Sequence, residues 1–393
     1  MALRTKSRSR DAASQTGTRQ GTSSEPPFGS AGNRQPRLAF VMEQTLGHVT
    51  HYQNLRGAID SAPHIATSWF PLPFEATGLT AMLPLVKSNW SARASWQAWQ
   101  ALQFGRGANR YDAVFFHTQV TTLLSTRLMR RVPAVISLDA TPLNYDAVGA
   151  AYGHHTGSGR VEAVKRALNR RALHAAMALI TWCDWARTSL VNDYGVDPDR
   201  ISVIAPGVNL AQWPGPQPRQ DAGAPVRFLF VGADFPRKGG DVLLEAFRGL
   251  EGACELHVVT KAQVKLEPGI SVYTNVTPNS DLLRRLYAKA DVFVLPTHAD
   301  CFPVAVQEAM AAGLPVIASD VGAIGEAVIP AETGMLVPPG DPAALREALL
   351  AMAHDLPARR AMGARARRIA ELKYDSAANA HRILDIMLHL VES

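Results

Sequence analysis

Short apolar runs alternate with longer segments of helical pattern from about residue 37 onward. The runs are rich in Val, Ile and Phe, and they are continuous rather than interrupted by polar residues at every second position. Such runs predict strands that are buried on both faces, as in parallel sheets covered by helices. They form two series, which are residues 38–43, 64–70, 111–118, 133–139 and 177–183, and then residues 227–233, 254–260, 270–276, 291–297 and 314–320.

A proline-rich stretch separates the two series. Residues 201–226 read "ISVIAPGVNLAQWPGPQPRQDAGAPV", and the prolines rule out a continuing helix or strand. We therefore predict a linker at residues 208–225 between domains of residues 37–207 and 226–375, with a helix over 376–393 that packs back on the first domain. A chain of 393 residues also exceeds the size at which one core usually stops growing.

The fold class that follows is α/β, with two Rossmann-like, doubly wound domains that face a central cleft. Ligands of such sheets bind at the carboxyl ends of the strands. A dinucleotide oxidoreductase is disfavoured because no G-x-G-x-x-G follows the first strand of either series.

Composition narrows the class of protein without naming a function. Residues 1–36 are rich in Arg, Ser and Gly and nearly lack large apolar groups, so we expect a disordered basic tail rather than a transit peptide. The formal charge of +6 suggests anionic partners. Three distant cysteines without a CxxC pair argue against a disulfide framework or a thiolate zinc site and fit a reducing cytoplasm. No apolar run reaches the roughly 18 residues that span a bilayer.

Two acids with seven residues between them mark the best candidate site. In "THADCFPVAVQEAMAAG" (residues 297–313) a loop carries Asp300, and the helix that follows carries Glu308 and is closed by Gly313. A helix N-terminus stabilises an anion. A diphosphate could therefore lie across this helix start, with one acid near each end of the ligand.

Arg237 and Lys238 supply cations at a corresponding place. They follow strand 227–233, the first of the second series. Arg can bind phosphate oxygens with two hydrogen bonds and Lys acts as a point charge, so the pair could neutralise a departing diphosphate without a metal. Elsewhere an Arg-Lys pair would more often be two solvated charges, but the end of this strand favours a site.

Together these motifs resemble the family-four, or group 1, glycosyltransferases, which have the GT-B fold, use nucleotide-activated sugars and retain the anomeric configuration. The family's Glu-seven-Glu signature matches Asp300 to Glu308, and its Arg-Lys phosphate clamp matches Arg237 and Lys238. Its "GLLVPPGD" segment matches "GMLVPPGD" from Gly334, and its linker phrase matches "VIAPGVN". Several linked motifs in the right order make the resemblance specific.

The resemblance implies a role for each matched residue. Glu308 would bind the ribose hydroxyls, and Asp300 would bind hydroxyls of the transferred sugar. The amides of Phe302 and Val304 would face the sugar or the phosphates. Gly47 would let a loop of the first domain approach the donor closely.

Two departures from the family concern the same site. Pro303 stands at the usual Gly position and has no N–H to offer. The family's His-Asp pair reads "SLDATP", with Leu138 at the His position and Asp139 retained as a catalytic candidate. His117, at the end of strand 111–118, is a candidate on the acceptor side, although a His at a strand end is as often a structural hydrogen-bonding group.

Two other features have competing interpretations. The aromatic segment "NWSARASWQAWQALQF" (residues 89–104) could dock on a membrane or a lipid-linked acceptor, while its helical spacing equally favours packing on the first sheet. Two histidine pairs, His48 with His51 and His154 with His155, lack a carboxylate or thiol at ligand spacing, so no metal site is predicted.

We therefore expect a metal-independent, retaining hexosyltransferase without a cofactor. It would move a sugar from a UDP- or GDP-sugar to a hydroxyl of a sugar or lipid-linked acceptor, in glycan or glycolipid synthesis. We expect a cytoplasmic location, with peripheral association with the inner face of the membrane left open, and no nucleic-acid partner. Two alternatives stay open: a non-catalytic nucleotide-sugar binder, which Leu138 and Pro303 would suit, and a nucleotide-sugar isomerase of the same architecture.

Overall fold

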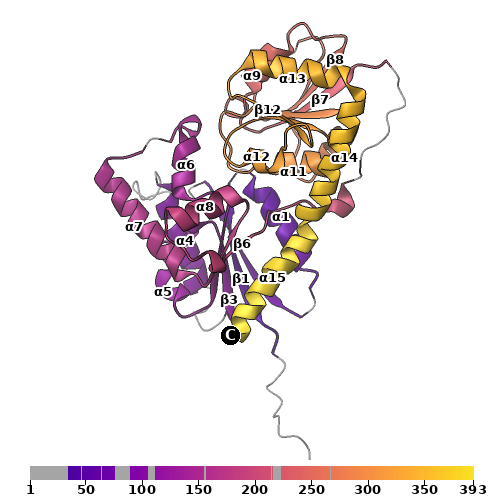
Figure 1. Ribbon diagram of the computed structural model, residues 1–393. Coiled ribbons are helices and arrows are strands. Elements are labelled where there is room, and N and C mark those ends of the chain that lie inside the picture. The colour runs from indigo at the N-terminus through magenta and orange to yellow at the C-terminus, as the bar shows by residue number, and fades with distance from the viewer. Residues whose placement is uncertain are drawn as a thin grey trace, which may run out of the picture. The chain divides into compact units, whose positions relative to one another are not determined.

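Two parallel sheets with helices on their faces form the frame of the molecule (Figure 1). The computed structural model describes residues 34–393 except residues 46, 63, 76–88, 105–110, 155, 214, 216–222 and 266. Within these residues the first sheet has the strand order β2-β1-β3-β4-β5-β6 and the second the order β12-β11-β10-β7-β8-β9. The predicted α/β class with two doubly wound sheets is confirmed. The predicted tail lies outside the described residues up to residue 33.

The strands are short, and four of them, β3, β4, β10 and β11, are buried along their whole length. Their bounds are β1 (Arg37–Gln44), β2 (Ala66–Pro73), β3 (Ala113–His117), β4 (Ala134–Leu138), β5 (Ala178–Thr181), β6 (Ile201–Val203), β7 (Val226–Val231), β8 (Cys254–Val259), β9 (Ile270–Tyr273), β10 (Val292–Leu295), β11 (Val316–Ser319) and β12 (Gly334–Val337). Strand β12 is not among the strands expected from the sequence. It is an edge strand of four residues that begins with a glycine, so it lacks the long apolar run by which a strand is recognised.

The helices connect these strands and cover both faces of each sheet. Their bounds are α1 (His48–Ile59), α4 (Trp90–Phe104), α5 (Thr126–Met129), α6 (Pro142–Val148), α7 (Gly159–Ala175), α8 (Asp184–Asn192), α9 (Gly240–Phe247), α10 (Asp281–Lys289), α11 (Val304–Ala311), α12 (Ile324–Ala327), α13 (Pro342–His354), α14 (Leu356–Lys373) and α15 (Ser376–Glu392), with short 3-10 turns η2 (Gln119–Thr121) and η3 (Gly149–Tyr152) among them.

Strand β1 shows why the first sheet needs helices on both sides. Leu38 and Phe40 pack in one cluster with residues of the C-terminal helix α15, such as Ile383, whereas Ala39 and Val41 belong to a separate cluster on the other face. All four side chains are inaccessible to solvent. A strand buried on both faces reads as a continuous apolar run, which is the pattern seen in the sequence.

Each sheet has one place where the chain changes direction. In the first sheet the chain runs from β1 to the edge strand β2 and then returns to β3 on the other side of β1. In the second sheet it runs outward through β7, β8 and β9 and then returns to β10, which pairs with the other side of β7. Loops diverge at such a switch point, and the carboxyl ends of the flanking strands form a crevice where ligands bind.

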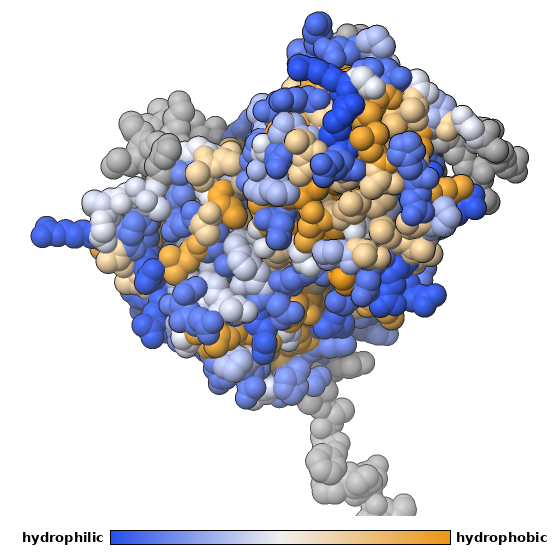
Figure 2. Space-filling view, turned by 45° about the horizontal axis from the view of Figure 1, so that its top comes forward, coloured by the Kyte–Doolittle hydropathy of each residue, from blue (hydrophilic) through white to orange (hydrophobic). Residues whose placement is uncertain are grey.

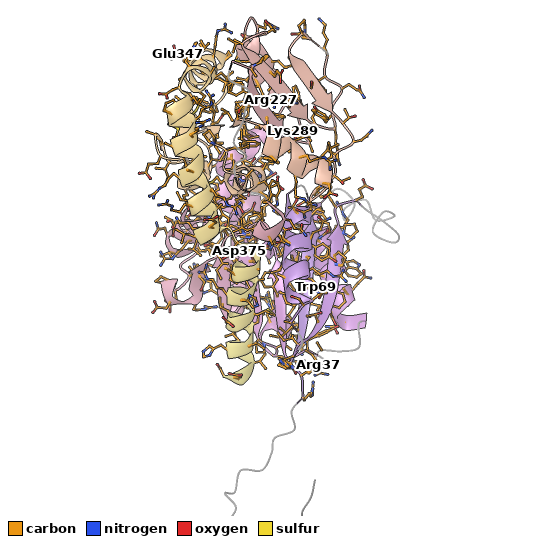
Figure 3. The ribbon with its side chains drawn as sticks, turned by 90° about the vertical axis from the view of Figure 1, so that its right-hand side faces the viewer. Arg37, Trp69, Arg227, Lys289, Glu347 and Asp375 are labelled. Carbon is orange, nitrogen blue, oxygen red and sulfur yellow. The ribbon has the colours of Figure 1, made fainter. Side chains whose placement is uncertain are left out.

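Two chain segments pass side by side between the sheets. Val208 donates its amide to the carbonyl of Tyr374 (2.8 Å) and accepts a hydrogen bond from the amide of Ser376 (2.9 Å). Gly207, with φ of +71°, leaves no room for a side chain, since a Cβ there would lie 2.6 Å from the Tyr374 carbonyl oxygen. Asp375 lies where α14 gives way to α15 (Figure 3). Helix α15 then packs against α1 and β3 of the first sheet.

Side-chain contacts also join the two sheets' loops. The carboxylate of Glu326 accepts hydrogen bonds from the amides of Asp184 (2.8 Å) and Trp185 (2.7 Å) at the start of α8. Gln307 accepts one from the amide of Gly207 (3.0 Å). Glu326 therefore supplies the anion that the N-terminus of α8 favours.

Candidate active site

Asp300 lies in the loop between β10 and α11, at the switch point of the second sheet. The loop is held from the side by the segment after β11, where Ala323 donates its amide to the carbonyl of Cys301 (2.9 Å). Gly322 has a φ of +57°, and a Cβ there would lie 2.1 Å from the Asp300 carbonyl oxygen. The close approach that glycine permits fixes the main chain that carries Asp300, whose side chain is only 11% exposed.

Lys238 and Arg237 lie against this loop. The ammonium group of Lys238 forms an ion pair with the carboxylate of Asp300. The guanidinium of Arg237, 4% exposed, donates to the side chain of Asp234 (2.9 Å) and to the carbonyl of Ala299 (2.8 Å). The structure therefore brings Arg237, Lys238 and Asp300 together between β7 and β10.

A tight turn makes this convergence possible. Gly239, at the start of α9, has a φ of +74°, and a Cβ there would lie 1.8 Å from the Pro296 carbonyl oxygen of the neighbouring loop. Any side chain at this position would force the two loops apart. The glycine thus permits Lys238 to reach Asp300.

The N-terminus of α11 offers free amides beside these charges. Among the described residues neither the amide of Phe302 nor that of Val304 donates a hydrogen bond to a protein acceptor. Pro303 is the N-cap residue and has no N–H. Phe302 turns its ring to the core, in edge contact with Tyr374 (centroids 6.2 Å apart). Unoccupied amides at a helix start are suited to bind an anion.

Glu308 lies one turn farther into α11 and is only 4% exposed. Its carboxylate accepts a hydrogen bond from the hydroxyl of Tyr287 on α10 (2.9 Å). Burial raises the pKa of Glu308 to about 7, against the opposing effect of the Tyr287 hydrogen bond. The seven-residue spacing thus places one acid in the loop beside the cations and the other inside the helix in an apolar setting.

The first sheet contributes a charged group at its own switch point. His48, the first residue of α1, lies with Nδ1 3.6 Å from Glu43 Oε1 and Nε2 3.6 Å from Asp139 Oδ2. Glu43 also accepts hydrogen bonds from the hydroxyls of Thr118 (2.6 Å) and Thr45 (2.5 Å). Burial works against a charged imidazole, but the two carboxylates outweigh it and raise the pKa of His48 to about 10. His48 is therefore an imidazolium at neutral pH.

Gly47 connects this group to the second sheet. A Cβ built on Gly47 would lie 3.8 Å from a methyl group of Val304, so the loop after β1 meets the start of α11. The two predicted donor-binding residues, Gly47 and Val304, are therefore neighbours. His48 follows Gly47 directly. In the sequence His48 was considered only as a metal ligand, and its ion pairs with Glu43 and Asp139 were not foreseen.

His117 and His51 form a buried layer beneath His48. His117 is fully buried, stacks on Trp182 (5.2 Å) and touches His48 edge-on (4.6 Å). Burial and the nearby His48 charge lower the pKa of His117 well below its ordinary value and that of His51 to about 3. Both rings are neutral, and neither ring nitrogen of His51 has a hydrogen-bond partner among the described residues. The acceptor-side role of His117 stays a prediction, and it would have to act through His48.

Asp139 and Leu138 have separate surroundings although they are adjacent. Leu138, the last residue of β4, is fully buried in the core of the first sheet. Asp139, at the carboxyl end of that strand, keeps 21% of its side chain exposed and contacts His48. Only the acid of the family's His-Asp pair therefore has access to the crevice. Asp139 still contacts an imidazole, but this is the ring of His48 on α1.

Tyr152 is a residue that the sequence did not mark. It ends η3, which follows α6, and its ring centroid lies 4.4 Å from the guanidinium carbon of Arg237. Burial and the nearby carboxylate of Asp300 raise the pKa of its phenol. Tyr152 is thus a neutral aromatic group of the first sheet's loops that covers the clamp arginine.

A separate concave surface lies elsewhere on the second sheet. Its volume is about 410 Å³, and its lining includes Tyr273 together with Arg227 and Lys289, which are labelled in Figure 3. None of the residues predicted to bind the donor lines it. The candidate site is instead defined by converging charges and free amides.

Metal ligands and membrane-spanning helices can be judged within the described residues. No group of three or more His, Cys, Asp or Glu side chains in that part of the chain is arranged to hold a metal ion. None of the described helices is both long and apolar enough to cross a membrane.

Comparison with known proteins assigns the chain to a family. The family model described as "Glycosyltransferase Family 4" matches residues 47–212, and the model described as "Glycosyl transferases group 1" matches residues 225–355. The chain belongs to the group 1, family-four glycosyltransferases. This glycosyltransferase is 29% identical over 311 residues to a D-inositol 3-phosphate glycosyltransferase of Corynebacterium efficiens, a match that covers 71% of this chain and 72% of the relative.

Solved structures confirm the GT-B fold of this glycosyltransferase. A sucrose-phosphate synthase from Thermosynechococcus elongatus has a TM-score of 0.70 at 19% identity, over 91% of this chain and 99% of the other. HepE from Anabaena, solved in complex with UDP-glucose, has a TM-score of 0.64 at 17% identity, over 90% of this chain and 99% of that one.

Proposed function

We propose that this glycosyltransferase moves a hexosyl group from a UDP- or GDP-sugar to a hydroxyl of a sugar or lipid-linked acceptor, with retention of configuration and without a metal or other cofactor. Its place would be glycan or glycolipid synthesis in the cytoplasm, at the inner face of the membrane. The convergence of Lys238, Arg237 and Asp300 beside the free amides of α11 carries the proposal. The UDP-glucose complex of the similarly folded HepE supports the donor class.

The donor would lie along the start of α11. Its diphosphate would accept hydrogen bonds from the amides of Phe302 and Val304 and lie against the cations of Arg237 and Lys238. Asp300, released from Lys238 as the phosphate takes that cation, would bind hydroxyls of the transferred sugar. Glu308 would bind the ribose hydroxyls. Two cations and a helix N-terminus supply the charge that a divalent metal supplies elsewhere.

Asp139 and His48 would act on the acceptor side. Because the imidazole of His48 is already protonated between two carboxylates, it cannot accept the proton of an acceptor hydroxyl. We assign it the task of holding Asp139 in place. The acceptor oxygen would bond to the anomeric carbon on the face that the phosphate leaves, the bonding pair would pass to the phosphate oxygen, and that oxygen would take the acceptor's proton.

A panel of nucleotide sugars, assayed with and without EDTA, tests the proposal. We expect turnover of one UDP- or GDP-sugar, unchanged activity in EDTA, and a product whose anomeric proton coupling matches that of the donor. An inverted anomeric centre would contradict the retaining mechanism. Activity that is lost in EDTA and restored by manganese would contradict the metal-independent clamp.

A nucleotide-sugar binder without turnover is the second candidate. It is favoured by the loss of the family's histidine at Leu138 and by the aromatic ring of Tyr152 over Arg237. Calorimetry would then report donor binding while the same panel gives no transfer or hydrolysis. A nucleotide-sugar isomerase would instead return an epimerised donor.

A further inference from the structure

Helix α7 is exposed in a way that the other helices of the first sheet are not. Of residues 159–168, its first ten, all are exposed except the half-buried Glu162. Packing begins only with Asn169, Ala172 and Leu173, where the helix contacts α5 and η2. Figure 1 shows the first turns of α7 extending away from the rest of that helical layer.

The exposed turns carry a stripe of large apolar side chains. Val161, Val164 and Leu168 are 49%, 60% and 46% exposed. At about 100° per residue, their side chains fall within a sector of roughly 60° on the helix surface. Single exposed apolar residues are ordinary, and Figure 2 shows them scattered among hydrophilic ones on the face it draws. Three on one stripe of a projecting helix form a continuous apolar edge.

Cations border this edge on both sides. By the same spacing, Arg160 and Arg171 lie on one flank of the stripe and Lys165 on the other, each within about 40° of it. All three are exposed, as are Arg166 and Arg170 farther round the helix. Glu162, the one acid of α7, is paired with Lys165 (2.8 Å) and accepts a hydrogen bond from the amide of Gly157 (2.7 Å).

We propose that α7 binds in the plane of an anionic membrane surface, with the Val161–Val164–Leu168 stripe among the acyl chains and the flanking cations on lipid phosphates. A helix with an apolar stripe bordered by Lys and Arg suits such an interface, because their stems can lie along the apolar zone while their charges reach the headgroups. The net positive charge of the chain draws it toward the same surface. A protein partner would need acidic groups along both borders of one narrow stripe.

The aromatic segment that the sequence marked for this role packs differently. Helix α4 buries Ala94, Ala98 and Leu102 against the first sheet, and among its described side chains Trp96, at 37%, is the one exposed large apolar residue. A shallow groove of about 370 Å³ is lined by Trp99 and Gln103 of α4, by Leu124, and by Arg127 and Leu128 of α5, which also contacts α7. The surface is therefore centred on α7 rather than on the tryptophans.

The position of α7 also relates the membrane to the candidate site. Tyr152, which covers Arg237, precedes Val161 by nine residues, so their Cα atoms lie no more than about 32 Å apart. A bilayer bound by α7 would be near the crevice in which a lipid-linked acceptor is proposed to react. The membrane surface itself does not depend on the proposed reaction, because it can be tested with vesicles in the absence of donor and acceptor.

Co-sedimentation of the full chain with lipid vesicles tests the proposal. We expect binding to phosphatidylcholine vesicles that contain phosphatidylglycerol and little binding to phosphatidylcholine alone. Val164→Glu should weaken binding by at least about tenfold, since it places a carboxylate in the apolar stripe. Replacing Arg160, Lys165 and Arg171 together by Gln should weaken it by about a hundredfold.

The matched control is Leu372→Glu. Leu372 is 79% exposed on the basic helix α14, so the change in charge and the exposed setting are the same, and the basic tail is present in every variant. This control should bind like the parent, and all variants should melt like the parent. Equal losses for Val164→Glu and Leu372→Glu, or no binding of the parent to anionic vesicles, would overturn the proposal. So would a parent that elutes as a dimer and becomes a monomer on Val164→Glu, because the stripe would then bind a second copy.

Discussion

The two sides of the candidate site are built in opposite ways. On the second sheet, the charged groups come from two short segments, with Arg237 and Lys238 adjacent and Asp300 and Glu308 on one loop and helix. On the first sheet, Glu43 lies near the end of β1 and His48 begins α1, but Asp139 follows the distant strand β4 and meets them only in the fold. A site made from contiguous segments is visible as a motif. A site assembled across strands has no sequence pattern of its own, although its charges are as closely coupled.

Lys238→Ala should have the largest effect and tests the motif side. It removes the cation that meets the growing charge on the leaving diphosphate, so kcat should fall by about a hundredfold to a thousandfold, with a smaller change in donor KM. Asp300→Ala should follow the same pattern. Steady-state kinetics at saturating acceptor measures both. Arg227→Ala is the control, since it removes a cation paired with Glu255 (3.2 Å) outside the site. A Lys238→Ala enzyme with the kcat of the parent would contradict the assigned role of Lys238 in stabilising the leaving diphosphate.

His48→Ala should come next and tests the assembled side. With the imidazolium gone, Glu43 and Asp139 lose the group that lies between them, and a displaced Asp139 should lower kcat by about a hundredfold. His48→Gln, which keeps a hydrogen-bond donor, should recover part of that loss. Equal damage in kcat and in melting temperature for both variants would indicate that His48 only supports the fold.

The same residue predicts a pH dependence of stability. The folded-state pKa of His48 is raised to about 10 from an ordinary 6.5, so its contribution to the free energy of unfolding is complete below pH 6.5 and is lost as pH rises through 10. Urea unfolding of the parent should therefore show declining stability from neutral pH to pH 10. The decline should be shallower in His48→Ala, and identical slopes would contradict the ion-pair geometry.

Glu308 should give a smaller, pH-dependent effect on donor binding. Its pKa of about 7 means that the carboxylate becomes protonated below neutral pH and loses capacity to accept ribose hydrogen bonds. Donor Kd should rise by about fivefold between pH 7 and pH 6, as measured by calorimetry. Tyr287→Phe removes a hydrogen bond that holds this pKa down, so its affinity should begin to fall at higher pH. Glu308→Gln should bind weakly with no such pH dependence.

Tyr152 should have the smallest effect. Tyr152→Ala removes the ring beside Arg237, and the loss of a cation–π contact should raise donor KM by about fivefold with little change in kcat. Tyr152→Phe keeps the ring and should behave like the parent. If Tyr152→Ala instead lowers KM, the ring obstructs the donor rather than supporting the clamp.

The fold was predictable because most of its strands are continuous apolar runs that can be recognised in the sequence. Runs such as that of β1 are buried on both faces, and continuous apolar runs of this length separated by helical segments are typical of parallel sheets covered by helices. The edge strand β12 was missed because four residues that begin with a glycine do not make a recognisable run. Its pairing is decided by the neighbouring strand rather than by its own side chains.

The site was predictable only where function depends on local backbone. The close approaches at Gly239 and Gly322 fix loops next to the residues they serve, so glycine, cation and acid appear as one pattern. By contrast, whether His48 or His117 reaches the crevice depends on how α1 crosses β1 and β3. Likewise, α4 and α7 are both amphipathic in sequence, and only their packing shows which one keeps its apolar residues exposed.

The paired crossing segments near Gly207 and Tyr374 constrain how such a molecule can open. One covalent connection would let the second sheet swivel in any direction. Two connections joined by hydrogen bonds, from Val208 to Tyr374 and from Ser376 to Val208, favour rotation about a single hinge axis that passes through both connections. Opening would then release the Glu326 carboxylate from the start of α8, while the hydrogen bonds between the two crossing segments stay intact. Substrate entry and product exit would thus follow the same arc.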